Sequence, residues 1–366
     1  KLVNVFTFFY TLYYLCTMEV DYIIVGCGLA GIAFCEQLYS NQKSFVVFDD
    51  QSQQSSLVAG GLYNPVVLKR FSKVWKSKEQ LDLAIPIYQN IEDRLDVKLD
   101  YKIPVRRRFT SLEEQNNWFE ASDKEGLKSF LNTNLITNEN DAIDADFKLG
   151  EVLETGKIDT NTLIDNYKDW LKKLNSYYPE SFNHNQLEVK STGIHYKTIK
   201  AKQIVFAEGF GLKQNPYFNF LPLNGTKGEL LIIKAPKLKL DYVLKSSAFL
   251  IPLKEKDQYI VGATYEWTDK TNTVTQKAKE ELLNKLKTFL KYDFEVVDQV
   301  AGIRPTVKDR RPLVGAHPEH KNMFVLNGLG TRGVMIGPYI AKQLFNHIEN
   351  EMPLDDEINI IRFTNL

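Results

Sequence analysis

The stretch that decides the fold is VDYIIVGCGLAG, residues 20–31. Its first half is a compact apolar run, typical of a buried strand, and residues 29–38 then follow a helical period. Gly26 permits a tight turn after the strand, Gly28 lets the backbone approach a pyrophosphate, and Gly31 lets the helix pack closely on the sheet. The pattern therefore predicts a βαβ unit that binds a dinucleotide.

A second apolar run, residues 45–48, completes this unit and ends in Asp49, 23 residues after Gly26. A carboxylate at this offset accepts hydrogen bonds from ribose hydroxyls, and the helix N-terminus stabilises the phosphate charge. A bare glycine-rich turn is the alternative, but the strand, helix and acid together favour a nucleotide site. We expect cofactor contacts from Gly26, Gly28, Leu29, Ala30, Gly31, Asp49 and Asp50.

Another glycine pattern, residues 328–333, follows the apolar run 324–326 and precedes a helix that ends near His347. Too little chain follows for another βαβ unit with its ribose-binding acid. We therefore expect one nucleotide fold, which argues against a two-nucleotide reductase.

Composition indicates an ordinary globular chain. Of 366 residues, 43% are hydrophobic, and 46 Lys and Arg balance 46 Asp and Glu, so no overall field attracts nucleic acid or a membrane. Cys16, Cys27 and Cys35 offer neither a disulfide framework nor a zinc cluster, and the five scattered histidines lack metal spacing. We expect no metal and a cytoplasmic location.

The N-terminal segment is strongly apolar from Leu2 to Cys16. It lacks a small-residue cleavage site and is shorter than a membrane span. We expect Met18 to be the natural start and residues 1–17 to be an extension outside the fold. A weak membrane anchor is the alternative.

Further along, the patterns predict a loop at residues 51–65 and a helix at 78–95 that Pro86 kinks or interrupts. Another helix starts at Asp159, and another spans about residues 276–290. Strands of a largely antiparallel region are expected at residues 187–189, 199–207, 229–233, 248–253 and 259–263.

From about Asp21 to the C-terminus, the chain resembles the D-amino-acid oxidase and glycine oxidase superfamily of flavoproteins. The resemblance rests on the glycine fingerprint and on motifs that follow in order: SSLVAGGL at 55–62, GKID at 156–159, AEG at 207–209, LPL at 221–223, KGE at 227–229, GAT at 262–264, GIRP at 302–305 and GLGTRG at 328–333.

The resemblance implies FAD as cofactor. It places the pyrophosphate loop at Ser56, Ala59, Gly60 and Gly61, a second contact at Ala207 and Gly209, and a loop at the flavin pyrimidine edge at Gly328, Gly330, Thr331, Arg332, Gly333 and Val334. Covalent members use a later Cys or a His before the Ala-Gly pair. Here no Cys follows Cys35, and Val58 precedes Ala59, so non-covalent FAD is expected.

The resemblance also assigns catalytic candidates. Arg304, which we also expect to contact the cofactor, would bind a substrate carboxylate, although a structural arginine is the alternative. Members commonly have a Tyr where this chain has Phe249, so one expected hydroxyl is missing. Tyr265 would either supply a hydroxyl near the flavin or simply pack. Cys27 is expected to be a packing residue.

The function that follows is oxidation of a C–N bond of a small amine or amino acid by hydride transfer to flavin N5. Residues 60–65 and 328–333 also resemble the oxidase domain of bifunctional enzymes that modify the tRNA wobble uridine by removing a carboxymethyl group. Two basic clusters, residues 69–78 and 106–108, could bind tRNA phosphates. A flavin-binding module without turnover is a third hypothesis.

The predicted fold is α/β with an α+β substrate domain: a Rossmann-like FAD domain interleaved with a mixed or antiparallel substrate domain. We expect the FAD domain at residues 18–62, 150–215 and 300–366, and the substrate domain at 63–149 and 216–299. Partners would be a small amine or amino acid, with tRNA as the less favoured one and no membrane.

Overall fold

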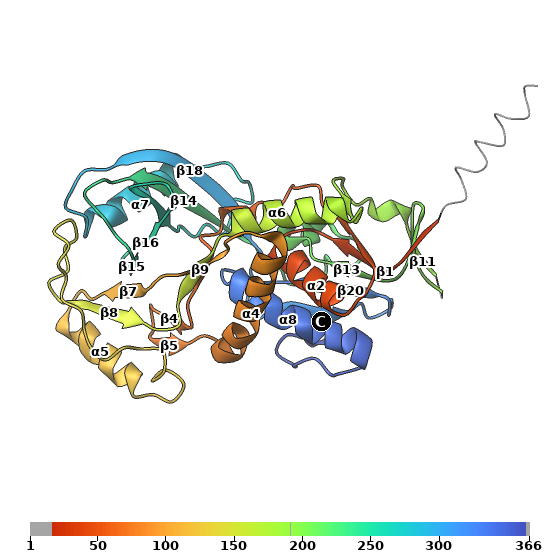
Figure 1. Cartoon of the computed structure of the whole chain (residues 1–366), viewed down its shortest axis with the longest axis horizontal. Helices are drawn as coiled ribbons and strands as arrows, with labels where there is room; N and C mark the ends of the chain where they lie inside the picture. The colour runs from red at the N-terminus through yellow and green to blue at the C-terminus, as the bar shows by residue number, and fades with distance from the viewer. Residues whose placement is uncertain (1–16, 191, 364–366) are drawn as a thin grey trace, which may run out of the picture.

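The computed structural model describes residues 17–190 and 192–363. The apolar segment at residues 1–16 lies outside the described residues, and with it the prediction of an N-terminal extension. The rest of the chain forms two sheet-based lobes joined by several crossings of the backbone (Figure 1). This α/β architecture confirms the predicted fold class, whereas the exact domain boundaries stay a prediction.

The larger sheet carries the glycine fingerprint. Parallel strands lie at its centre, with β1 between β2 and β13, and the central strands are buried on both faces, as is typical of parallel sheets. Its strands are β10 (Tyr177–Tyr178), β2 (Phe45–Phe48), β1 (Met18–Val25), β13 (Ile199–Phe206), β12 (Gly193–Tyr196), β11 (Leu187–Lys190), β20 (Met323–Asn327) and β19 (Leu313–Ala316).

Helices cover one face of this sheet (Figure 1). They are α2 (Leu29–Ser40), α4 (Ser77–Leu95), α6 (Thr160–Lys173) and α8 (Gly333–Asn350), and their apolar sides share one core with alternate residues of β1 and β2. The other face carries a second apolar core, which it shares with the 3-10 helix η2 (Gly209–Gln214) and residues 215–223. The C-terminal ends of β1 and β13 therefore lie between two apolar layers.

The predicted strands at residues 187–189 and 199–207 form within the part of the chain expected to bind FAD, but the expected antiparallel arrangement is wrong for the second of them. β11 and β13 belong to the fingerprint sheet, and β13 runs parallel to both β1 and β20. Antiparallel pairing in this sheet is found along the β11–β12–β13 edge and between β19 and β20. The physical reason is that a nearly continuous apolar run, such as Ile204–Phe206, suits a central parallel strand buried on both faces.

The second sheet lies in the other lobe and is mostly antiparallel, as predicted. Its order is β18 (Glu295–Arg304), β14 (Thr226–Lys234), β17 (Gln258–Gly262), β16 (Phe249–Pro252), β15 (Val243–Lys245), β7 (Val105–Arg108) and β8 (Leu149–Val152). Helix α7 (Gln276–Lys287), which Thr275 caps, packs on one face through Leu282 and Leu286. Helix α5 (Leu112–Ser122), which Ser111 caps, packs near β7 and β8.

Two local predictions need correction. Residues 51–65 are not all loop, because helix α3 (Ser55–Val58) and strand β3 (Leu62–Tyr63) form there. Helix α3 packs so closely on β18 that a Cβ at Gly302 would lie 3.2 Å from the Ser55 Cα. Helix α4 continues through Pro86 without interruption, since the apolar face on either side of the proline stays buried in the core.

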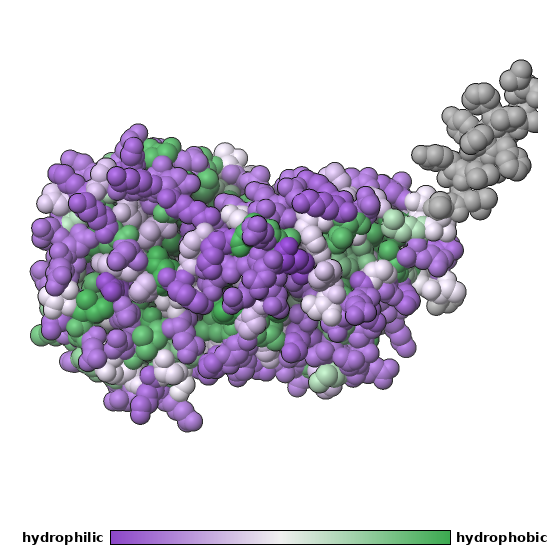
Figure 2. Space-filling model, in the orientation of Figure 1, coloured by the Kyte–Doolittle hydropathy of each residue, from purple (hydrophilic) through white to green (hydrophobic). Residues whose placement is uncertain are grey.

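Smaller elements complete the described chain: β9 (Gly156–Ile158) pairs with β3 and β6 (Asp100–Lys102), β4 (Val66–Val67) pairs with β5 (Ser72–Lys73), and η1 (His184–Gln186) and η3 (Ile360–Phe363) are 3-10 helices. Hydrophilic side chains cover most of the face in Figure 2. None of the helices in the described ranges is long and apolar enough to cross a membrane.

Candidate active site

The fingerprint glycines lie where β1, β13 and α2 meet. Gly26 has a φ of +103°, and a Cβ there would lie 2.5 Å from the Ala207 carbonyl oxygen at the end of β13. A Cβ at Gly31 would lie 2.0 Å from the Gly26 carbonyl oxygen. Gly28 provides no side-chain cap at the start of α2. The Leu29 amide donates to the Ser56 hydroxyl at 3.3 Å, and the next amide of the first turn, that of Ala30, is available to an anionic group.

Asp49 and Asp50 follow the end of β2, beside that turn. Asp49 accepts hydrogen bonds from the Cys27 amide at 3.3 Å and the Tyr177 hydroxyl at 3.1 Å, and forms an ion pair with Lys168 at 2.8 Å. Lys168 comes from α6, and no local pattern predicts that it reaches Asp49. These three neighbours orient the Asp49 carboxylate. That this carboxylate binds a ribose stays a prediction.

Asp50 is oriented in a similar way. It accepts hydrogen bonds from the Ser52 amide at 3.0 Å and from the Ser181 hydroxyl at 2.7 Å. Burial raises the pKa of Asp50, but these hydrogen bonds outweigh burial, and the net pKa lies below the ordinary value. The group is therefore a carboxylate near neutral pH.

The predicted pyrophosphate loop lies against α2 and β9. The Ser56 hydroxyl accepts a hydrogen bond from the Leu29 amide at 3.3 Å, and the Ala59 carbonyl accepts one from the Thr160 hydroxyl at 3.3 Å. Gly61 has a φ of +66°, and a Cβ there would lie 1.9 Å from the Ile158 carbonyl oxygen. Ser56 is thus brought to the fingerprint turn.

The end of β13 meets the second glycine loop through Asn327, a buried residue that the sequence analysis missed. Its side-chain amide donates to the Gly209 carbonyl at 2.9 Å, and its side-chain oxygen accepts from the Gly328 amide at 2.7 Å. Gly330 donates from its amide to the Pro305 carbonyl at 3.1 Å. The only available signal was an amide side chain directly after a buried strand.

These parts line a cleft of about 300 Å³ that runs along the ends of β1, β2 and β13. Of the predicted cofactor residues, Gly26, Gly28, Leu29, Ala30, Asp49, Asp50, Ser56, Ala207 and Gly209 line it, together with His184, Glu208 and Asn327. Uncapped amides at one side and oriented carboxylates at the other fit a pyrophosphate joined to a ribose.

Arg304 ends β18, on the side of the second lobe. Its Nη1 donates to the Thr264 carbonyl at 3.3 Å, and its Cζ lies 4.9 Å from the centre of the Tyr265 ring. A Cβ at Gly228, on the neighbouring strand β14, would lie 1.8 Å from the Arg304 Nη2. The guanidinium therefore lies flat over Gly228. No sequence motif predicts this contact.

Arg332 directly precedes α8, whose first turn, with Gly333 and Val334, also has no side-chain cap. Burial lowers the pKa of both Arg304 and Arg332, while the Tyr265 hydroxyl acts electrostatically on both in the opposite direction. Within residues 17–190 and 192–363, neither arginine forms an ion pair. Tyr265 is thus placed near two half-buried cations that lack a protein carboxylate; Thr331 beside them is exposed.

Comparison with known proteins decides the family. The family model described as FAD dependent oxidoreductase matches residues 21–346, which is most of the chain. The chain belongs to this family of FAD-dependent oxidoreductases. FAD is therefore its cofactor, and the cleft lined by the fingerprint has the donors and carboxylates that FAD needs. The predicted superfamily and the predicted cofactor are confirmed.

Two curated relatives show the range within this FAD-dependent family. The glycine oxidase of Bacillus subtilis is 25% identical over 229 residues, which are 58% of this chain and 62% of the relative. The tRNA 5-methylaminomethyl-2-thiouridine biosynthesis bifunctional protein MnmC of Shewanella halifaxensis is 25% identical over 219 residues, or 46% of this chain and 34% of the relative. The matched part is thus less than two thirds of either relative.

Solved structures of other FAD-dependent oxidoreductases share the fold. Glycine oxidase from Geobacillus kaustophilus superposes with a TM-score of 0.75 at 20% identity, covering 95% of this chain and 98% of that one. Iminodiacetate oxidase from Chelativorans sp. BNC1 gives a TM-score of 0.72 at 15% identity, covering 94% and 98%. At these identities the likeness supports the fold and not a substrate.

Two buried charges on β14 hold the loop that carries Tyr265. Lys227 forms an ion pair with Asp269 and donates to the Thr273 carbonyl. Glu229 accepts from the Thr275 amide and hydroxyl, each at 2.8 Å. Both side chains are almost fully buried, so the KGE motif serves as the anchor of residues 265–275 above Arg304.

The basic cluster 106–108, and part of the cluster 69–78, form ion pairs within the protein. Arg106, Arg107 and Arg108 pair with Glu151, Glu114 and Asp144 respectively. In the other cluster, Lys76 pairs with Asp355 and Lys78 with Asp82. These pairs remove much of the free positive charge that a phosphate-binding surface would use. Cys27 is buried, and burial raises the pKa of its thiol, as befits a packing residue.

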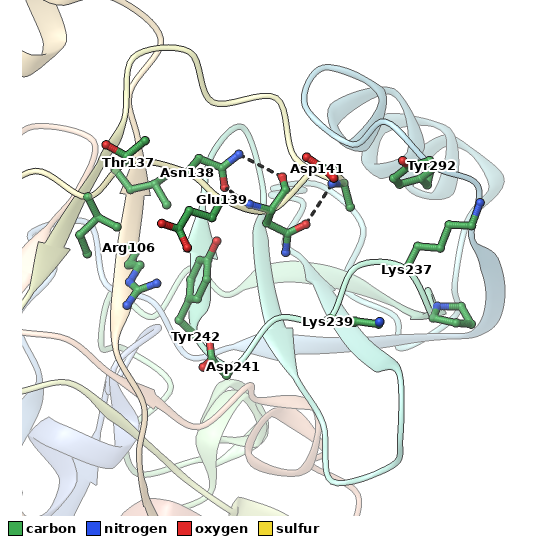
Figure 3. A pocket seen from close by; sticks show the side chains of 15 residues that line it. Arg106, Thr137, Asn138, Glu139, Asp141, Lys237, Lys239, Asp241, Tyr242 and Tyr292 are labelled. Carbon is green, nitrogen blue, oxygen red and sulfur yellow. Dashed lines mark hydrogen bonds between the residues drawn. The ribbon is translucent and has the colours of Figure 1, made fainter.

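A larger cavity of about 900 Å³ lies in the second lobe, between residues 136–142 and 236–242. Figure 3 shows acidic and basic side chains interspersed around it, with Arg106 beside Tyr242 and Lys237 beside Tyr292. Arg106, from the basic cluster 106–108, lines it, but none of the residues predicted to contact FAD or the amino acid does. Its size therefore does not make it the candidate active site.

A Gly228→Ala substitution tests whether the contact with Gly228 positions the Arg304 guanidinium. The new Cβ would overlap the Arg304 Nη2, so the guanidinium must move, and we expect kcat/KM for the substrate to fall by about 10- to 100-fold, the worth of a misplaced charged hydrogen bond. FAD content and Tm should stay near wild type. Steady-state kinetics measures the effect.

The double variant Gly228→Ala/Arg304→Met provides the control. Because both changes act on one guanidinium, the double variant should be no slower than Arg304→Met alone. Additive losses would show that Gly228 acts through something other than Arg304.

Proposed function

We propose that the protein oxidises the C–N bond of a small amino acid whose carboxylate is held by Arg304 and Arg332. The observation that carries this proposal is the pair of half-buried guanidinium groups beside Tyr265, neither of which has an acidic partner in the described chain. A buried cation without a partner is costly, and a bound carboxylate would offset that cost. The curated relatives named glycine oxidase support the same substrate class.

FAD, when bound, accepts the hydride from the carbon that bears the nitrogen. The chain's own part is to orient that carbon. Arg304 is held against Gly228 and the Thr264 carbonyl, so its outer edge is free to bind a carboxylate in bidentate fashion. The Tyr265 ring lies against the guanidinium, and the anchored loop 265–275 limits how far that ring can move.

Anaerobic absorbance tests this function directly. The FAD-loaded protein is mixed with glycine, sarcosine and the D- and L-forms of alanine and proline, and the visible flavin band is followed. We expect at least one of these amino acids to bleach the band, while the matching amine without a carboxylate does so far more slowly. Retention of the band with every small amino acid would contradict the proposal.

Transfer RNA bearing carboxymethylaminomethyl-uridine belongs in the same panel. Bleaching by this tRNA alone would replace the proposed substrate by the wobble-uridine alternative, which the MnmC relatives suggest. We also propose a reducing, cytoplasmic setting, because the described cysteines Cys27 and Cys35 are free and buried.

A further inference from the structure

A row of residues across the second sheet links Arg304 to a lysine that no part of the proposed chemistry uses. Leu230 of β14 pairs with Gly262 of β17, Gly262 with Phe249 of β16, and Phe249 with Lys245 of β15. Directly opposed residues of antiparallel strands point to the same face of a sheet. Lys245 therefore shares a face with Leu230.

Arg304 lies over this same face. Residues two apart on a strand point the same way, so Gly228 shares the face of Leu230, and the Arg304 guanidinium covers Gly228. The opposite face is filled by α7 and its apolar core. Farther along β16, Ile251 lies so near the cofactor loop that a Cβ at Gly60 would be 2.8 Å from its Cδ1. The face of the second sheet that carries Leu230 and Lys245 is therefore turned toward the predicted pyrophosphate loop.

Lys245 is directed back along this row. Its Nζ lies 4.4 Å from the centre of the Phe249 ring, one strand nearer to Arg304 than its own backbone. The Cα atoms of Leu230 and Lys245 are three strand spacings apart, roughly 14 Å, and the extended lysine shortens that gap. Two cations therefore stand at the two ends of one apolar strip.

Positively charged side chains from three neighbouring segments lie near Lys245. Arg107 lies on β7, Lys285 on α7, and Lys69 in the turn after β4. Arg107 and Lys285 have acidic partners in Glu114 and Glu281, whereas Lys245 forms no ion pair within residues 17–190 and 192–363. Burial, followed by repulsion from these three groups, lowers the pKa of Lys245 to about 8.

We propose that Lys245 binds a second carboxylate of the substrate, so that the preferred substrate is an amino acid with an additional acidic group remote from the one that Arg304 holds. A second anion at this point offsets the repulsion among the four cations and gives the half-buried ammonium its missing partner. The inference rests on the proposed function, because it takes Arg304 as the first carboxylate site.

Inert carboxylates test it without turnover. The FAD-loaded protein is titrated with acetate and butyrate and with dicarboxylates from malonate to pimelate, and binding is read from the perturbation of the flavin spectrum. We expect one dicarboxylate length to bind at least about tenfold more tightly than butyrate, the worth of one charged hydrogen bond. Lys245→Met should abolish this preference and leave acetate binding within twofold, while Lys245→Arg keeps part of it.

Lys285→Met is the matched control, since Lys285 is also close to Lys245 but pairs with Glu281; it should keep the preference for the dicarboxylate. The pH dependence adds a second signature. A lysine with a lowered pKa is charged below that pKa, so the preference should decline as the pH rises through about 8. Lys245→Met should show no such decline.

The outcomes separate the two proposals. If dicarboxylates of every length bind no better than butyrate, or if Lys245→Met weakens acetate and dicarboxylates alike, the inference about Lys245 is overturned while the Arg304 site stands. If no carboxylate perturbs the flavin at all, the proposed carboxylate site fails as well.

Discussion

A Gly31→Ala variant is expected to lose FAD. The added Cβ would lie 2.0 Å from the Gly26 carbonyl oxygen, and because that atom belongs to the backbone of the fingerprint turn, no side-chain rotation can relieve the overlap. Helix α2 must move away from the turn, which spoils the alignment of its amide groups with the pyrophosphate. We expect the Kd for FAD to rise by ~100-fold or more.

Gly337 offers a matched control in a helix that packs against α2. A Cβ there would make ordinary contacts, 3.5 Å from the Leu29 carbonyl oxygen and 3.7 Å from the Ala33 Cβ. Gly337→Ala should bind FAD as wild type does and gain up to about 1 kcal/mol of stability from helix propensity. Both variants are compared by fluorescence titration with FAD and by thermal unfolding of the apoprotein. Wild-type FAD affinity in a well-folded Gly31→Ala protein would contradict the predicted turn.

An Arg304→Met variant is expected to keep FAD and lose the substrate. Methionine retains much of the apolar bulk of arginine but offers no charge to a carboxylate, and truncating one partner of a buried charge pair costs about 2–5 kcal/mol. We expect kcat/KM for the best amino acid to fall on the order of 10³-fold, measured as the rate of anaerobic flavin reduction against substrate concentration.

Two further variants locate that effect. Arg304→Lys keeps the charge but loses the planar fork, so its rate should fall between those of wild type and Arg304→Met. Arg70→Met, at an exposed site in the β4–β5 turn, should change the rate by less than about twofold. An unchanged rate in Arg304→Met, with the flavin still reducible by amino acids, would move the carboxylate site elsewhere.

The part of the fold that could be predicted is the part governed by local chemistry. Strand β1, helix α2 and strand β2 form where the apolar runs and glycines predict them. The cap at Asp159 starts a helix as its sequence indicates, and α7 begins at Gln276, where the apolar period predicts a helix. The cofactor followed from these local features and the motif order, and the family model confirms it.

The parts that could not be predicted depend on contacts between distant segments. Nothing near residues 199–206 says that this strand runs parallel between β1 and β20 rather than in an antiparallel ladder. The seat of Arg304 arises from the register that opposes Gly228 to Gly302 in the β14–β18 pair, and register is set by the whole sheet. Lys168 and Asn327 reach the cleft from elements whose placement is a tertiary property.

The two strands that pair with one side of β13 have a consequence for folding during synthesis. Along one side, β13 pairs with β12 at its first half and with β20 at its second half. On the ribosome, the edge at Ile204–Phe206 therefore waits unpaired until residues 323–325 have been made. An apolar edge left open for that long invites association between nascent chains. Bound FAD cannot cover this edge earlier, because Asn327, which joins β20 to Gly209 in the cleft, is synthesised at the same late stage. We therefore expect the nascent chain to need chaperones whether or not FAD is in good supply.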